Sequence, residues 1–182
     1  MLVRRLSMVF FAVVLLVIPF RQALTATSSP QSDPKKDAIL KASDITPAIF
    51  PEKVFYHGQV ADAQMRNTGG IHFADGLYVL AGLVDTSGYA TAVKEKYQGY
   101  FLNEVPVEMN GQSLKPGAYG IGFVAEAKFL VTDLGGNTIL EITGQRDADL
   151  KRPTPLQVLA APDTGAYRLY LGRNFVTIKR VS

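Results

Sequence analysis

Polar side chains that could bind a ligand are concentrated in one stretch of the chain, His57–Gly70. Five of them lie within eleven residues: His57, Gln59, Gln64, Arg66 and Asn67. Such a set can line a polar recess that holds a ligand such as a sugar, with Tyr56, Tyr78 or Tyr89 as a stacking surface. The same amides can instead bridge backbone groups of an irregular segment, and we favour this structural interpretation. The candidate ligand-binding residues are therefore His57, Gln59, Gln64, Arg66, Asn67 and Tyr89.

Histidine and cysteine content decides what metal chemistry is open to the chain. The two histidines, His57 and His72, do not stand in a spacing such as His-x-His or His-Glu-x-x-His. They could converge in space with Asp62, Asp75 or Asp85 as a third ligand, but ordinary hydrogen-bonded or exposed histidines explain them more simply. The chain has no cysteine, which excludes disulfides, thiolate metal sites and a lipidated cysteine. We predict no metal and no cofactor.

Two further patterns contain residue types that could be catalytic, a serine in a tight turn and a pair of glutamates. Ser87 lies in Asp85-Thr-Ser-Gly88, which does not match the Gly-x-Ser-x-Gly nucleophile elbow; a helix-capping Ser87 beside a turn-forming Asp85 explains the same residues. Glu104 and Glu108 would lie roughly 13 Å apart along a strand, too far to act across one glycosidic bond. We expect both glutamates to be solvated and the protein not to be an enzyme.

The elements that would position these residues are mostly strands. From Lys53 onward, runs of Val, Ile, Leu, Phe and Tyr alternate with Gly, Pro, Asn and Asp about every eight to twelve residues, which is typical of antiparallel all-β domains. Asp75-Gly76 and Asn110-Gly111 suit type I′ hairpin turns, and Pro116-Gly117 suits a type II turn. Further reversals are expected at 135–137, 163–165 and 172–174. We predict an antiparallel barrel or sandwich of about ten strands with one short helix.

Alternation within the strands predicts their buried faces. Two sets of side chains are expected in the core: Val105, Val107 and Met109, and Tyr119, Ile121 and Phe123. Gly120 and Gly122 indicate a bend, a bulge or a close neighbouring element.

The helix is predicted over Ser87–Tyr97, with Ser87 as its N-cap and Gly99 just past its end. Its spacing of Tyr89, Val93 and Tyr97 forms an aromatic face that would close one end or side of the β domain.

Charge argues against a polyanionic partner. The formal net charge is +3, with 19 basic and 16 acidic residues. Arg4, Arg5 and Arg21 account for the whole excess, because the first 26 residues contain no acidic side chain. Affinity for nucleic acid or an anionic membrane requires a sustained excess of Lys and Arg, so neither is expected as a partner of the body. Any binding should depend only weakly on salt.

The N-terminus has the organisation of an export signal. Arg4 and Arg5 precede an apolar run, Met8–Phe20, that is too short to span a bilayer, and small residues follow up to Ala26. We predict a signal peptide over residues 1–26, cleaved after Ala26, with an uncleaved anchor as the alternative. Residues 27–52 would form a Pro/Ser-rich tether and a short helical lead-in over Asp37–Ser43, and residues 53–182 a single β domain. The protein would be exported, to the periplasm or outside the cell, contacting a membrane only through the signal segment before cleavage.

Two segments carry a resemblance: Val54–Phe101, VFYHGQVADAQMRNTGGIHFADGLYVLAGLVDTSGYATAVKEKYQGYF, and Leu150–Ile178, LKRPTPLQVLAAPDTGAYRLYLGRNFVTI. The chain resembles a group of exported, functionally uncharacterised all-β proteins of soil Acidobacteria, which implies export and carries over no site. Our first functional hypothesis is a non-enzymatic domain that binds a small molecule, a glycan or a surface partner. The second is a structural or assembly protein of the cell envelope that associates through sheet edges.

Overall fold

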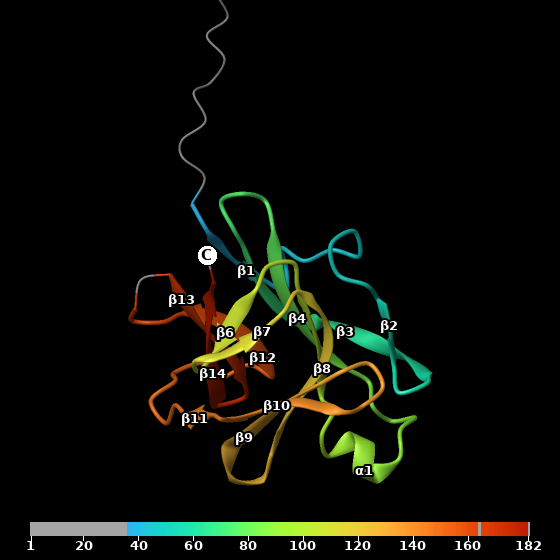
Figure 1. The fold of residues 1–182 in the computed structure, drawn as a ribbon. Helices are drawn as coiled ribbons and strands as arrows, with labels where there is room; N and C mark the ends of the chain where they lie inside the picture. Colours follow the sequence, from blue (N-terminus) through green and yellow to red (C-terminus); the bar gives the residue numbers. More distant parts are fainter. Residues whose placement is uncertain (1–35, 164, 182) are drawn as a thin grey trace, which may run out of the picture. The chain divides into compact units, whose positions relative to one another are not determined.

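The described part of the chain folds into two antiparallel sheets that pack face to face. A computed structural model describes residues 36–163 and 165–181, and 14 strands lie in these ranges (Figure 1). The sheets form a sandwich and do not close into a barrel, so the all-β prediction is confirmed in its sandwich form. The predicted signal peptide and the first part of the tether lie outside the described residues.

The large sheet has the order β1-β3-β4-β5-β8-β9-β10, and β2 pairs with the first half of β3. Its strands are β1 (Ala38–Lys41), β2 (Lys53–Tyr56), β3 (Gln59–His72), β4 (Tyr78–Val84), β5 (Gly99–Asn103), β8 (Gly117–Val124), β9 (Lys128–Thr132) and β10 (Thr138–Thr143).

The small sheet has the order β12-β13-β14-β6-β7, and β11 pairs with the start of β14. Its strands are β6 (Val107–Met109), β7 (Gln112–Leu114), β11 (Gln145–Arg146), β12 (Leu156–Ala160), β13 (Ala166–Leu171) and β14 (Asn174–Arg180).

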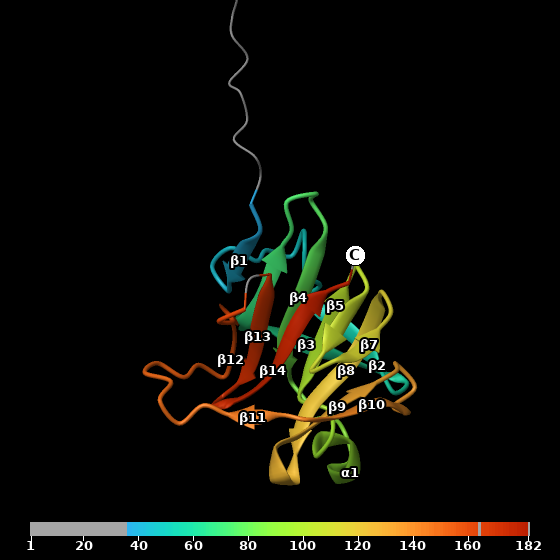
Figure 2. The same cartoon turned by 60° about the vertical axis from the view of Figure 1, so that its left-hand side comes forward.

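Helical structure is slight. The α-helix α1 (Thr91–Lys94) lies at the end of the sheets opposite the turn between β3 and β4 (Figures 1 and 2), and a 3-10 turn, η1 (Ala125–Ala127), joins β8 to β9. Among the described residues α1 is the only α-helix, and its four residues fall far short of the length needed to cross a bilayer.

The main core lies between the two sheets, as period-two alternation requires. The predicted core sets are confirmed: Val107 and Met109 are fully buried, Val105 nearly so, and Tyr119, Ile121 and Phe123 face them from β8. On one side of the sandwich the sheets are also joined by amides, because Asn110 Nδ2 donates to Thr143 O (2.8 Å) and Gln112 Nε2 donates to Glu141 O (3.1 Å).

A second core covers the outer face of the large sheet. It is built by the segment between β1 and β2, by the β2–β3 hairpin and by the segment around α1, with Phe50, Tyr56 and Tyr97 as its largest buried side chains. Gly120 and Gly122 belong to this face: a Cβ at Gly120 would lie 2.5 Å from the Tyr56 ring and one at Gly122 would meet the Lys96 carbonyl. Of the three explanations expected for these glycines, a bend, a bulge or a close neighbouring element, the structure shows the close neighbouring element.

The predicted helical lead-in over Asp37–Ser43 is wrong. Ala38–Lys41 forms strand β1, paired in register with Gly69–His72 of β3, where one or two helical turns were expected. Ile45 and Phe50 beyond it are buried in the outer core. In β1, Ile39 packs against the inner core and Leu40 against the outer core. This segment forms a strand because a strand can bury side chains on both faces of a sheet that is covered on both sides.

The predicted helix is shorter than expected. It covers Thr91–Lys94 rather than Ser87–Tyr97, and Ala90 is its N-cap, so Ser87 is not the capping residue. The predicted role of its aromatic residues is nevertheless confirmed, because Tyr89 and Tyr97 are buried against the outer face of the large sheet. Asp85 forms the expected turn: its carboxylate accepts the Ser87 N–H at 2.9 Å, and this bond lowers the pKa of Asp85.

Three of the turns test the local predictions. Asn110-Gly111 has φ values of 46° and 84° between paired Met109 and Gln112, which confirms a type I′ turn. Asp75-Gly76 belongs to a longer turn, since Gly76 N–H bonds to Phe73 O and only Gly76 has positive φ. The type II turn at Pro116-Gly117 is wrong, because Gly117 starts β8 with an ordinary φ.

The buried tyrosines predict how stability responds to alkaline pH. Burial and the Asp37 carboxylate, which accepts the hydroxyl hydrogen bond of Tyr167, raise the pKa of Tyr167 to about 12, and burial also raises the pKa of Tyr56, Tyr89 and Tyr100. The folded state therefore keeps phenol protons that the unfolded chain releases near pH 10. The contribution of these tyrosines to the free energy of unfolding is fully present below about pH 10 and is lost as the pH rises through their higher folded-state pKa values.

Urea unfolding between pH 8 and pH 11, read beside tyrosinate absorbance, should show tyrosine ionisation and unfolding together above about pH 10. Titration of all eight tyrosines near pH 10 in a protein that stays folded would contradict this.

Candidate functional site

The predicted ligand-binding residues do not converge on one recess. His57 occupies the first position of the two-residue β2–β3 turn, with φ 48°, followed by Gly58 with φ 77°. Its backbone N–H donates to Leu134 O at 2.7 Å, and its ring lies against Gly136 of the β9–β10 turn. His57 therefore ties the tip of the hairpin to a neighbouring turn.

Tyr89 and Gln59 are also held by structural contacts. The Tyr89 hydroxyl donates to Tyr56 O at 3.0 Å and lies 3.4 Å from Gln59 O, while the Tyr89 ring is buried. The ring packs edge-on to Tyr56 and Tyr97, with centroids 6.2 and 5.6 Å away. This tyrosine fastens the β2–β3 hairpin to the segment around α1 and does not offer a surface for stacking a ligand.

Gln64 and Asn67 lie in an irregular part of the long strand β3. Between the pairs Ala63↔Val84 and Thr68↔Gly82, β3 has four residues where β4 has one. Gln64 Nε2 donates to Val84 O (3.1 Å), and Asn67 Nδ2 donates to Gln64 Oε1 (2.8 Å). These bonds favour the structural interpretation: Gln64 bonds to a backbone carbonyl of β4 beside the bulge, and Asn67 orients Gln64.

The stretch predicted as an irregular loop is thus a 14-residue strand with a bulge. Polar composition misled the prediction because β3 changes its environment along its length. Its first half forms a hairpin with an exposed face, and its second half runs between β1 and β4, where residues 68–71 are buried. Arg66 is exposed in the bulge and lines a different cavity, described below.

The two histidines lie in different parts of the fold and make different contacts. His57 is in the turn described above, whereas His72 ends β3 and stacks on Tyr78 with ring centroids 4.3 Å apart and planes 4° apart. Within residues 36–163 and 165–181, no group of three or more metal-ligating side chains is close enough to hold an ion.

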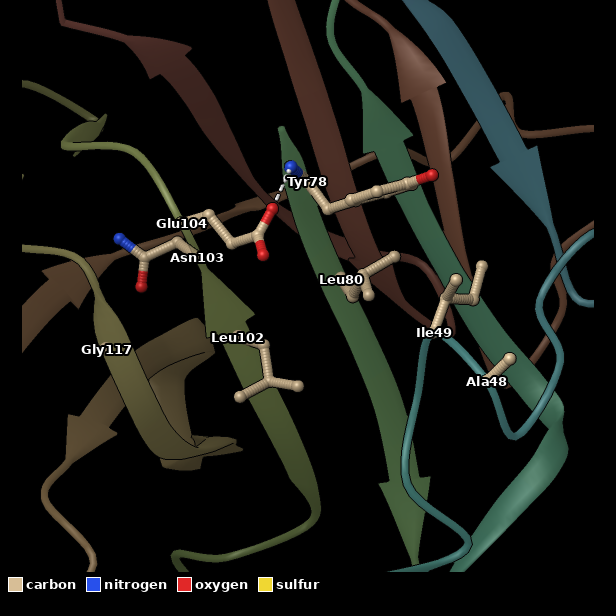
Figure 3. A pocket seen from close by; sticks show the side chains of 8 residues that line it. All are labelled: Ala48, Ile49, Tyr78, Leu80, Leu102, Asn103, Glu104 and Gly117. Atoms are coloured by element: carbon tan, nitrogen blue, oxygen red, sulfur yellow. Dashed lines mark hydrogen bonds between the residues drawn. The ribbon is translucent and has the colours of Figure 1, made fainter. Parts of the chain in front are cut away.

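A recess of about 380 Å³ opens on the outer face of the large sheet, beyond the edge of the outer core (Figure 3). Its lining comes from β4, β5, the start of β8 and the segment between β1 and β2: Ala48, Ile49, Tyr78, Leu80, Leu102, Asn103, Glu104 and Gly117. Alternation in β4 and β5 places Tyr78, Leu80 and Leu102 on this outer face, and Leu80 pairs with Leu102 across the two strands. The floor is apolar.

One aromatic ring and one carboxylate supply the chemistry of the recess. The stack on His72 fixes the orientation of the Tyr78 ring. Glu104 Oε2 accepts the Tyr78 N–H at 2.8 Å, and Oε1 has no hydrogen-bond partner among the described residues. Asn103 lines the recess but its amide points away from Tyr78 and Ile49 in Figure 3; Asn103 Nδ2 donates to Val105 O and Lys115 O. A ligand with an apolar face and a hydrogen-bond donor fits this arrangement.

Sequence reasoning included Tyr78 among possible stacking residues and expected Glu104 to be solvated. Glu104 is exposed, as expected, but it follows β5 and does not lie on a strand face. Its backbone N–H donates to Tyr78 O at 3.0 Å and continues the β4–β5 ladder by one step. The alternation of Tyr78 and Leu80 was visible in the sequence. The pairing that brings Leu102 and Glu104 beside them was not, because the 14 residues between β4 and β5 include α1.

Comparisons of the chain with models of known protein families, with curated proteins and with solved structures find no match. The geometry of the site alone therefore supports a functional proposal.

Proposed function

We propose that this protein is a non-enzymatic binding domain whose recess on the outer face of the large sheet takes a saccharide unit. The observation that supports the proposal is one recess lined by the Tyr78 ring, which stacks on His72, by the Glu104 carboxylate and by apolar side chains. A pyranose presents an apolar C–H face that packs on an aromatic ring and hydroxyl groups that donate to a carboxylate. The recess would therefore hold a sugar by stacking and by hydrogen bonds.

Substitutions at the ring and the carboxylate test this proposal with soluble oligosaccharides containing glucose, galactose, mannose or N-acetylglucosamine. The sugar that raises the Tm most is titrated by calorimetry. Tyr78→Ala should weaken its binding about tenfold or more, whereas Tyr78→Phe keeps the ring and most of the affinity. Glu104→Gln should weaken binding by a similar factor, because a charge-assisted hydrogen bond is lost.

Glu108→Gln, on β6, is the matched control and should leave binding unchanged. Affinity should change little between low and physiological salt, because no ligand charge is involved. If none of the oligosaccharides raises the Tm, or if Tyr78→Ala binds as the wild type does, the saccharide proposal is wrong.

One observation favours self-association as a second candidate function. Phe55 of β2 and Val60 of β3 face each other across the hairpin and are 54% and 62% exposed. Among the described strands β2 pairs only with β3, so a second copy could cover this apolar pair and extend the hairpin. Light scattering after size exclusion should then show dimers that Phe55→Ser abolishes; a monomer at all concentrations would exclude this candidate.

A further inference from the structure

A second cavity, a groove, lies on the side of the sandwich where strands β1 and β12 form the sheet edges. Strand β1 ends the large sheet and β12 ends the small one, and a groove of about 480 Å³ lies between these two edge strands. The opposite side is joined by the amides of Asn110 and Gln112, which reach from the β6–β7 hairpin to β10. The two sides of the sandwich therefore differ: amides join the sheets on the β10 side, and a groove lies between the sheet edges on the β1–β12 side.

The walls of this groove are largely apolar. Ile39 projects from β1, and Leu156 and Val158 project from β12 toward the inner core. Leu159 also lines the groove, and it is 36% exposed. Leu156 and Val158 are buried, so an alkyl chain lying here would cover mainly Leu159 and the half-buried Ile39.

The uncharged polar side chains of the groove already have partners. Ser43 donates to Asp44, Thr68 to Met65 O, Thr154 to Leu156 O and Gln157 to Arg152 O. Each of these side chains therefore has at least one bond within the fold, and the strongest groups left to recognise a ligand are the charged ones.

Two cations stand at the groove, Lys41 at the end of β1 and Arg66 in the bulge of β3. Neither takes part in the four ion pairs of the described residues, which join Lys53, Lys128, Arg168 and Arg180 to other carboxylates. The nearest acidic side chain in sequence, Asp44, accepts bonds from the Lys41 N–H and the Ser43 hydroxyl. The groove therefore combines an apolar channel with an excess of positive charge at one of its ends.

We infer that this groove binds an amphipathic carboxylate, a linear alkyl chain ending in one carboxyl group, with the chain between β1 and β12 and the carboxylate at Lys41 and Arg66. The inference does not depend on the saccharide recess, because the two cavities share no lining residue. An arginine can bind a carboxylate through two parallel N–H···O bonds, which gives Arg66 the larger share of head-group recognition. The apolar walls select for chain length.

The test uses decanoate below its micellar concentration, with hexanoate and decanol as chemical controls, in calorimetric titrations of the purified protein. Decanoate should bind at least tenfold more tightly than hexanoate, because each buried methylene adds roughly a threefold to fourfold gain in affinity. It should also bind at least tenfold more tightly than decanol, which has the chain but no charge. Equal affinity for decanoate and decanol would overturn the inference.

Variants locate the site on the protein. Arg66→Glu should weaken decanoate binding about tenfold or more, and Lys41→Glu should weaken it by a smaller factor. Lys179→Glu makes the same charge change on β14, away from the groove, and should leave the affinity unchanged. Arg66→Gln, a milder change at an exposed position, provides a second reading if the glutamate variant is destabilised.

Wild-type affinity in both Arg66 variants, or equal losses in Arg66→Glu and Lys179→Glu, would overturn the inference. So would binding of an acidic peptide along the β1 edge by a protein that does not bind decanoate.

Discussion

Replacing Tyr97 with alanine should lower the free energy of unfolding by about 3–5 kcal/mol, as for a large aromatic side chain removed from a core. Tyr97 is fully buried, its ring stacks on Tyr56 with centroids 3.7 Å apart and planes 18° apart, and Tyr89 meets it edge-on. It also follows α1 directly, so its ring holds the segment around the helix against the large sheet. Urea unfolding followed by circular dichroism measures the change.

Replacing Tyr97 with phenylalanine is the matched control, and it should leave stability equal to or above that of the wild type. The Tyr97 hydroxyl is buried, and no hydrogen-bond partner for it exists among the described residues. Burial in these apolar surroundings also raises the pKa of Tyr97, so the phenol stays protonated. Phenylalanine therefore keeps the stack and loses no hydrogen bond to a protein group. A loss of more than about 1 kcal/mol in Tyr97→Phe would show that the hydroxyl contributes a bond that this account omits.

Replacing Gly122 with alanine should lower the free energy of unfolding by about 1–3 kcal/mol or more, the usual cost of overpacking. The added Cβ would collide with the carbonyl oxygen of Lys96 and would lie 3.0 Å from the carbonyl carbon. Both atoms are backbone, so no side-chain rotation can relieve the contact. Gln98 fixes this approach through two bonds to Phe123, since its Nε2 donates to Phe123 O and its Oε1 accepts the Phe123 N–H.

Gly88→Ala is the control for Gly122→Ala. Gly88 has no positive φ, and the closest atom to an added Cβ is Gln59 Oε1 at 3.8 Å, an ordinary contact. Its unfolding free energy should stay within about 0.5 kcal/mol of the wild-type value. Equal stability of both alanine variants would mean that the segment 96–98 does not pack on β8 as described.

These two predictions concern the outer layer because it borders the recess at Tyr78. The recess at Tyr78 begins where the cover of the outer core ends, and one wall of it, Ala48 and Ile49, belongs to the same segment that buries Phe50. Loosening this layer would change the recess even though no ligand-contacting residue is substituted. Binding measurements on Tyr97→Ala and Gly122→Ala would therefore report stability together with site geometry.

Local patterns in the sequence were enough to predict the fold class, several strands and one turn. The alternation in Val105–Met109 and Tyr119–Phe123, and the left-handed conformations favoured by Asn110-Gly111, depend on neighbouring residues only, and the structure confirms all of them. The glycines at 120 and 122 indicated a bend, a bulge or a close neighbouring element, without deciding among the three. The type II turn at Pro116-Gly117 failed because a proline-glycine pair also suits the entry to a strand, where Gly117 pairs with Asn103.

The positions of the candidate binding groups depend instead on contacts between distant segments. Arg66 faces a groove because β1, 25 or more residues earlier in the chain, pairs with the end of β3 while β12 packs across them. Tyr78 and Glu104 meet because β4 and β5 pair in one particular register. Period-two patterns tell which residues share a face, but a sheet covered on both sides makes both faces apolar. The pairing of strands, and with it the location of the recess and the groove, follows from the packing of the whole domain.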